Sequence, residues 1–144
     1  DETKKIYIAA LFHDIGKYKV PNEIVGKKGK LSEVEFSIIK KHCEYSYDIL
    51  KDFLSSDLLE IIKSHHERCD GSGYPRGVIP NLGAKILGIV DSFDAMTSNR
   101  VYHNQKSILE AYKELELCVI SHKEGGKGRL FDKQLVQKFI EVNN

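Results

Sequence analysis

Six side chains of the types that bind transition metals fall at the ends or on the buried faces of expected helices. They are His13, Asp14, His42, His65, His66 and Asp91. A set of imidazoles and carboxylates without thiolate is typical of sites for iron, manganese, zinc or nickel, whereas calcium and magnesium prefer ligands that are all oxygen. Six ligands are more than a single ion can use. The residue types therefore predict a transition-metal site with more than one ion.

Two pairs of adjacent residues, His13 with Asp14 and His65 with His66, fall at expected C-terminal helix ends. Adjacent helical residues point about 100° apart, so each pair can share one ion only near a frayed end, or else faces two ions. The carboxylate of Asp14 could bridge two cations about 3.5–4 Å apart, which would lower the pKa of a bridging water and neutralise charge on a phosphoryl oxygen. The pattern indicates metal-assisted hydrolysis that requires no Ser or Cys nucleophile.

Each of these groups also has a plainer interpretation. A single histidine on an amphipathic helix, such as His42, is more often packed or solvated than bound to a metal. His65 and His66 could lie at a solvated helix end, where the helix dipole favours the imidazolium. Asp91 and Asp94 could form an exposed acidic stripe on one side of a helix. If no metal site exists, a separate plain interpretation must hold for each of these groups. A single metal site accounts for all of them together, so we favour it.

The candidate ligands are carried by segments that have the hydrophobic spacing of helices. Ser32 and Glu35 match a capping box that opens one segment, and Asp132 can cap the last. Residues 70–83 contain four glycines and two prolines, a composition typical of a long ordered loop. The sequence has no strand pattern of useful length, so it predicts an all-α fold. The expected helices cover residues 3–15, 32–53, 56–69, 84–98, 107–119 and 132–142.

Composition limits the partners and the location of the chain. Its 144 residues are 41% hydrophobic, and 22 basic against 21 acidic residues leave a net charge of +1. This is the length of one domain, and the balanced charge gives no electrostatic reason to bind DNA or an anionic membrane. Three cysteines without a CxxC pair argue against a disulfide framework and against a thiolate zinc site. Without a signal-peptide pattern or an apolar run of about 20 residues, we expect a cytoplasmic domain.

Three segments carry a resemblance to a known family. HDIGK begins at His13, HHERCDGSGYPRG begins at His65, and VDSFDAMTSNRVY begins at Val90. In this order, with His42 between the first two, they resemble the HD-GYP family of HD-superfamily phosphodiesterases. The resemblance implies an HD-domain helical bundle over residues 1–144 that hydrolyses cyclic di-GMP to linear pGpG, to GMP or to both, in bacterial second-messenger signalling. It also implies two or three divalent metal ions, iron or manganese first, with zinc or nickel as alternatives.

The resemblance also implies roles for single residues. The six metal-binding residues match the family's ligands, with Asp14 as the bridging and catalytic carboxylate. One ion is served mainly by His42, His65 and His66, and the other by His13 and Asp91. Lys17 matches a lysine that contacts phosphate and assists catalysis. The residues that match nucleotide contacts, besides Lys17, are Tyr74, Asp94 and Arg100, and those that shape the loop are Gly73 and Pro75.

The chain departs from the family pattern at several points. The family's metal site also uses a glutamate and a histidine from a helix before the HD pair, and that helix is absent from this chain. We therefore expect an N-terminally truncated domain in which one ion lacks a ligand, with a sensor or receiver domain upstream. His103 stands where a basic residue is frequent, Ser46 where a glycine is frequent, and Cys69 where a tryptophan is frequent.

Two other functions remain open from the sequence. A catalytically impaired HD-GYP module would bind a cyclic dinucleotide or a partner signalling domain, such as a diguanylate cyclase, without turnover. A different HD-superfamily hydrolase would act on a mononucleotide, although the DGSGYPRG loop that begins at Asp70 is not a general feature of that superfamily. A homodimer through exposed helices is compatible with either.

Overall fold

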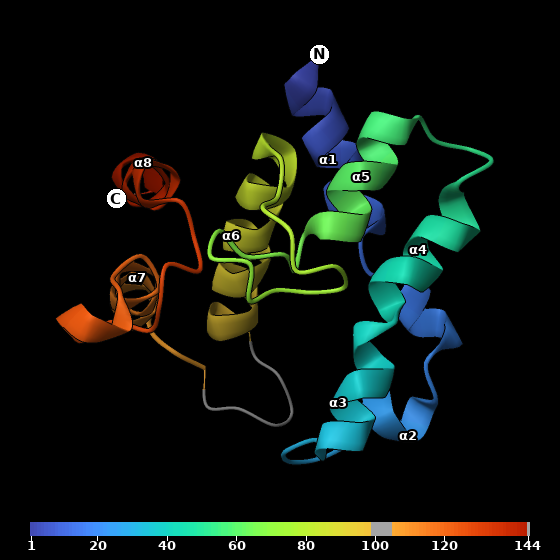
Figure 1. The fold of residues 1–144 in the computed structure, drawn as a ribbon, viewed down its shortest axis with the longest axis horizontal. Coiled ribbons are helices and arrows are strands. Elements are labelled where there is room, and N and C mark those ends of the chain that lie inside the picture. Colours follow the sequence, from blue (N-terminus) through green and yellow to red (C-terminus); the bar gives the residue numbers. More distant parts are fainter. Residues whose placement is uncertain (99–104, 144) are drawn as a thin grey trace.

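The computed structural model describes residues 1–98 and 105–143, and these residues form a bundle of helices (Figure 1). Over these residues no strand occurs, so the prediction of an all-α fold is confirmed. None of the helices in the described ranges is both long and apolar enough to cross a membrane. The α-helices are α1 (Glu2–Phe12), α2 (Asn22–Val25), α3 (Glu33–Lys40), α4 (His42–Leu50), α5 (Ser56–Ser64), α6 (Leu82–Thr97), α7 (Ile108–Leu117) and α8 (Lys133–Asn143).

Helix α6 lies between two hydrophobic clusters and contributes to both. Figure 1 shows α1, α4 and α5 on one side of it and α7 and α8 on the other. Leu87 of α6 is buried in the first cluster, and Ile89 is buried in the second. The remaining buried members of the first cluster are Ala9, Leu50, Leu58, Leu59, Ile61 and Ile62, and those of the second are Leu115, Cys118, Phe131 and Val136. Because this apolar burial fixes α1, α4, α5 and α6 together, it also fixes the ends of these helices, where the candidate ligands lie.

Several helices begin at the residues that the sequence indicates. Ser32 and Glu35 form the expected capping box, in which each side chain bonds the other residue's backbone N–H. Ser107 caps α7, and the carboxylate of Asp132 accepts hydrogen bonds from backbone N–H groups at the start of α8. Such caps satisfy donors that have no partner within the helix.

The structure corrects the expected helix between residues 32 and 53. It is divided into α3 and α4 at Lys41, so His42 begins α4 instead of lying in the middle of a helix. The break coincides with a contact of the His42 side chain, whose Nδ1 lies 2.7 Å from the carbonyl oxygen of Ile39 in the last turn of α3. The helix expected to reach about residue 69 ends at Ser64, where His65 makes the corresponding contact.

Candidate metal centre

Three candidate ligands, His13, His42 and His65, have the same local structure at a helix end. His13 and His65 directly follow the last residues of α1 and α5, and His42 lies two residues after the end of α3. In each, Nδ1 contacts the carbonyl oxygen three residues earlier, on Ala10, Ile39 and Ile62 respectively, at 2.8, 2.7 and 2.6 Å. A carbonyl oxygen only accepts hydrogen bonds, so Nδ1 carries the proton and Nε2 keeps a free lone pair. This is the tautomer that a metal-binding imidazole needs, and the backbone holds its orientation.

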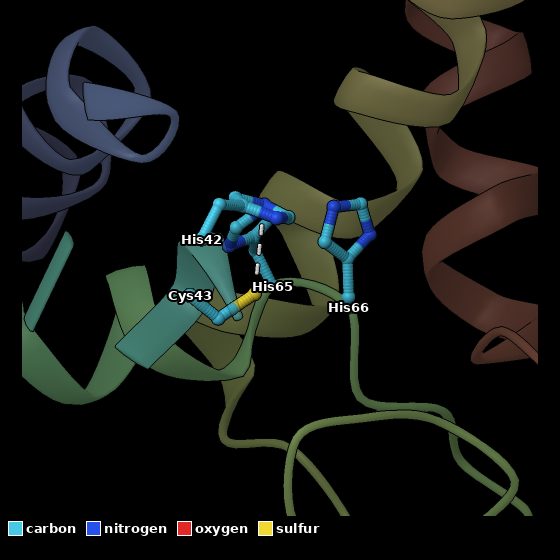
Figure 2. A group of neighbouring side chains, drawn as sticks. All are labelled: His42, Cys43, His65 and His66. Carbon is cyan, nitrogen blue, oxygen red and sulfur yellow. Dashed lines mark hydrogen bonds between the residues drawn. The ribbon is translucent and has the colours of Figure 1, made fainter. Parts of the chain in front are cut away.

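The imidazoles converge on one point between the helix ends. The Nε2 atoms of His42 and His65 lie 3.5 Å apart, and Figure 2 shows His66 with its ring beside them. The ring centroids of His65 and His66 are 4.0 Å apart, and those of His13 and His65 are 4.9 Å apart. Donor atoms of His13, His65 and Asp91 lie within 4.8 Å of one another. The structure thus brings together five of the six candidate ligands, drawn from four different helices or their ends.

The sixth candidate, Asp14, lies between two of the histidines. Its Oδ1 is 3.4 Å from Nε2 of His42, and its Oδ2 is 3.5 Å from Nε2 of His13. Oδ2 is also 2.5 Å from Nζ of Lys17, which lies on the 3₁₀ turn Ile15–Lys19. The two oxygens of one carboxylate therefore face different histidines, the placement that a bridging ligand requires.

Two buried polar atoms of this cluster have no hydrogen-bond partner, Nε2 of His13 and Oδ1 of Asp14. Leaving a buried acceptor unpaired costs about 1–3 kcal/mol, so native structures rarely retain such atoms without a compensating ligand. Both atoms are Lewis bases, and both face the other candidate ligands. Their position fits a cation.

The pKa values of the cluster follow from burial and from charge. Burial lowers the pKa of His42, and it lowers the pKa of His65 to about 4, so both rings are neutral at pH 7. Burial also acts to lower the pKa of His13, but the facing carboxylates of Asp91 and Asp14 outweigh it and raise this pKa. The His13 ring in turn overcomes the effect of burial on Asp91 and holds the pKa of that carboxyl low. Neutral imidazoles and ionised carboxylates are the protonation states that bind metals. The pKa shifts of His42, His65 and Asp91 favour these states, whereas the raised pKa of His13 opposes the neutral ring.

The loop after α5 places Tyr74 against the histidines. Its ring stacks on that of His66, with centroids 4.7 Å apart, and its backbone N–H donates to the His66 carbonyl oxygen at 3.2 Å. Gly73 permits this approach, because a Cβ there would lie 2.5 Å from that oxygen. The peptide bond from Tyr74 to Pro75 is cis. Burial raises the pKa of the Tyr74 phenol, which therefore stays protonated at pH 7 and can donate a hydrogen bond.

Two of the residues expected to contact the nucleotide, Asp94 and Arg100, are not placed at the cluster by the described structure. Asp94 is exposed on α6, three residues after Asp91, and its Oδ1 accepts a hydrogen bond from Ser98 at 2.8 Å. Arg100 and His103 lie outside the described residues, so their expected roles remain predictions from the sequence.

Three further residues near the cluster, Glu67, Ser46 and Cys43, have structural contacts that the sequence does not predict. The carboxylate of Glu67 is buried and accepts from the backbone N–H groups of Arg76 and Val78, which fixes the Tyr74 loop. The hydroxyl of Ser46 accepts from the backbone N–H of Gly16 and donates to the carbonyl oxygen of His13, so it links the HDIGK segment to α4. Cys43 has its Sγ 3.6 Å from Nε2 of His42. The signal in the sequence that could have drawn attention to this cysteine is its position directly after a candidate ligand.

Sequence comparison with known proteins places the chain in a protein family. A family model described as HD domain matches residues 1–135. The chain belongs to the HD domain family. The resemblance to HD-GYP phosphodiesterases that the motifs carry is confirmed, because several similar proteins are named cyclic di-GMP phosphodiesterases.

Three of these relatives illustrate the extent of the similarity. A cyclic di-GMP phosphodiesterase of Thermotoga maritima is 41% identical over 96% of this chain. The 3'3'-cGAMP-specific phosphodiesterase 1 of Vibrio cholerae is 42% identical over 74% of the chain. The cyclic di-GMP phosphodiesterase response regulator RpfG of Xanthomonas campestris is 33% identical over 97%. The aligned part makes up 37%, 26% and 36% of these relatives, so this chain spans between about a quarter and somewhat more than a third of their length.

Proposed function

We propose that residues 1–144 form a metal-dependent HD-GYP phosphodiesterase domain that hydrolyses cyclic di-GMP to linear pGpG, to GMP or to both. The observation that carries this proposal is the placement of Asp14, whose two oxygens face His42 and His13 within a cluster of imidazoles. A carboxylate in that position can serve two cations at once, which is the arrangement used in two-metal hydrolysis of phosphate esters.

The residues present fit such cations. His42, His65 and His66 would hold one ion, His13 and Asp91 a second, and Asp14 would bridge them. When bound, the ions would supply an acidified water and positive charge beside the phosphoryl oxygens. The unpartnered Nε2 of His13 and Oδ1 of Asp14 support this assignment. Iron or manganese is proposed first for a site of imidazoles and carboxylates, with zinc or nickel as alternatives.

Other side chains of the chain would bind and orient the substrate. The ammonium group of Lys17, next to Asp14 and partly exposed, is placed to contact a phosphate oxygen as a point charge. Tyr74, stacked on His66, presents an aromatic ring and a neutral phenol beside the proposed metal site. Asp94 and Arg100 are proposed to contact the nucleotide, and Gly73 and Pro75 to shape the loop that carries Tyr74.

The choice of cyclic di-GMP rests on the names of most relatives aligned over more than nine-tenths of this chain. One relative in that group, the 3'3'-cGAMP-specific phosphodiesterase 2 of Vibrio cholerae, aligns over 97% and carries the other substrate in its name. The proteins of T. maritima and X. campestris, aligned over 96% and 97% of this chain, are both named cyclic di-GMP phosphodiesterases. Because these relatives extend well beyond the aligned part, we also propose that the parent protein carries a sensor or receiver domain that controls this one. The chain itself would act in the bacterial cytoplasm, where this second messenger is found.

The test is an incubation of the purified chain with manganese and either cyclic di-GMP or 3'3'-cGAMP, followed by chromatography of the nucleotides. We expect linear product from cyclic di-GMP at a higher rate than from 3'3'-cGAMP, and no product with His65→Ala. Binding of cyclic di-GMP without product, by metal-loaded protein, would contradict the proposal and favour a binding module. A preference for mononucleotides would contradict it in favour of another class of hydrolase.

A further inference from the structure

The side chain of Cys43 lies among the histidines at the start of α4. Cys43 is fully buried. Figure 2 shows its sulfur pointing toward the ring of His42, with the side chain of His65 nearby. One donor atom from each of His42, Cys43, His65 and His66 can be chosen so that all lie within 4.8 Å of one another. This thiol is thus part of a group of four possible ligands.

Two spacings within this group match those of ligands on a common ion. Zinc binds imidazole nitrogen at about 2.0–2.1 Å and thiolate sulfur at about 2.3 Å, and tetrahedral angles then separate two nitrogens by about 3.3 Å and a nitrogen from a sulfur by about 3.6 Å. The Nε2 atoms of His42 and His65 are 3.5 Å apart, and Sγ of Cys43 is 3.6 Å from Nε2 of His42. The side chains are therefore already spaced as neighbouring ligands.

The lone pairs are directed to the same place. Nδ1 of His42 and Nδ1 of His65 donate to backbone carbonyls, so the Nε2 atom of each ring carries a lone pair and no proton. The two Nε2 atoms face each other, and Nε2 of His42 also faces the thiol of Cys43. Two Nε2 acceptors 3.5 Å apart cannot hydrogen-bond to each other, because neither carries a proton. A cation between the two Nε2 atoms can bind both lone pairs, whereas the S–H group of Cys43 is a weak donor and can serve only one of them.

We propose that Cys43 is a thiolate ligand of the ion held by His42, His65 and His66. On binding, the S–H bond breaks, its proton passes to solvent, and a sulfur–metal bond forms. A soft sulfur ligand shifts the preference of this position toward zinc or ferrous iron and away from manganese. This inference rests on the proposed function, because it concerns one of the ions that the proposed reaction would use.

Cobalt(II) is a direct probe, since thiolate coordination gives a charge-transfer band in the near ultraviolet that imidazole and carboxylate ligands do not give. Metal-free protein is titrated with cobalt(II), and the bound metal is counted separately by elemental analysis. We expect the band in the wild-type chain and in Cys69→Ser, whose cysteine lies outside the cluster, and its loss in Cys43→Ser and Cys43→Val.

Bound cobalt without this band in the wild-type chain would overturn the inference, and this result needs no variant to fold. A band that persists in Cys43→Ser would overturn it too. If the band is absent while cyclic di-GMP is still hydrolysed, only this inference fails and the proposed function stands. A Cys43-dependent band in a chain without turnover would support the ligand and contradict the proposed function.

Discussion

The hydroxyl of Ser46 joins the segment that carries His13 and Asp14 to helix α4. It accepts a hydrogen bond from the backbone N–H of Gly16 at 2.9 Å and donates one to the carbonyl oxygen of His13 at 2.7 Å. Ser46 is completely buried, and a Cβ at Gly16 would lie 2.1 Å from the His42 carbonyl oxygen, so the two segments are in close contact. The hydroxyl is therefore shielded from bulk solvent at the contact between the two segments.

Replacement of this residue in Ser46→Ala leaves both backbone groups without their partner. A buried donor without a partner costs about 1–3 kcal/mol, and loss of the second, partly buried hydrogen bond adds about 0.5–1.5 kcal/mol. We expect the free energy of unfolding of the metal-free chain to fall by about 2–4 kcal/mol. With an m-value of about 2 kcal/mol/M, the urea midpoint falls by about 1–2 M.

Ser37→Ala is the matched control for this measurement. Its hydroxyl also bonds a backbone carbonyl, that of Val34 at 2.7 Å, but it lies exposed on α3. A change at an exposed site of this kind is expected to stay within about 0.5 kcal/mol. Equal losses in Ser46→Ala and Ser37→Ala would refute the claim that the buried hydroxyl holds the two segments together.

Three further outcomes are expected. Zinc or manganese at 100 times its Kd stabilises the metal-free chain by about 2.7 kcal/mol and so raises its Tm. In thermal scans His65→Ala abolishes most of this rise in Tm. Burial lowers the pKa of His65 from 6.5 in the unfolded chain to about 4 in the folded chain, so the His65 ring is protonated in the unfolded chain at a higher pH than in the folded one. The free energy of unfolding, measured with a chelator present, therefore falls as the pH drops from 6.5 toward 4. In urea titrations His65→Gln flattens this slope, whereas the exposed His122→Gln keeps it. Glu67→Gln replaces one carboxylate oxygen by an NH2 group, which sets a donor against one of the two N–H groups, of Arg76 and Val78, that the carboxylate accepts from. Hydrogen exchange of the loop 70–80 therefore speeds up, and unchanged exchange would contradict the anchoring role of Glu67.

The helical pattern and the caps were predictable because both depend on local sequence. Ser32 with Glu35 and the apolar spacing of α6 indicate their helices directly, since capping and amphipathic burial act within a few residues. The break at Lys41 was not predictable, because it coincides with a side chain that competes for a helical carbonyl. Periodicity cannot distinguish this histidine from one within a continuous helix.

The candidate site was predictable in its membership and less so in its arrangement. Residue type and motif order single out His13, Asp14 and His65, but the convergence of their donor atoms depends on the packing of α1, α4 and α5 against α6. Ser46 and Cys43 were missed as site residues for this reason. Their partners are Gly16 and His42, and nothing in the sequence states that the HDIGK segment lies against the start of α4.

The central claim is that Asp14 and the converging histidines hold the ions of a phosphodiesterase. Its most direct test is the rate of cyclic di-GMP hydrolysis as manganese is returned to metal-free protein, in the wild-type chain, Asp14→Asn and the exposed control Asp48→Asn. We predict that activity rises with bound manganese in the wild-type chain and in Asp48→Asn, and is lost in Asp14→Asn. Hydrolysis without metal, or equal activity of Asp14→Asn and Asp48→Asn, would contradict the account.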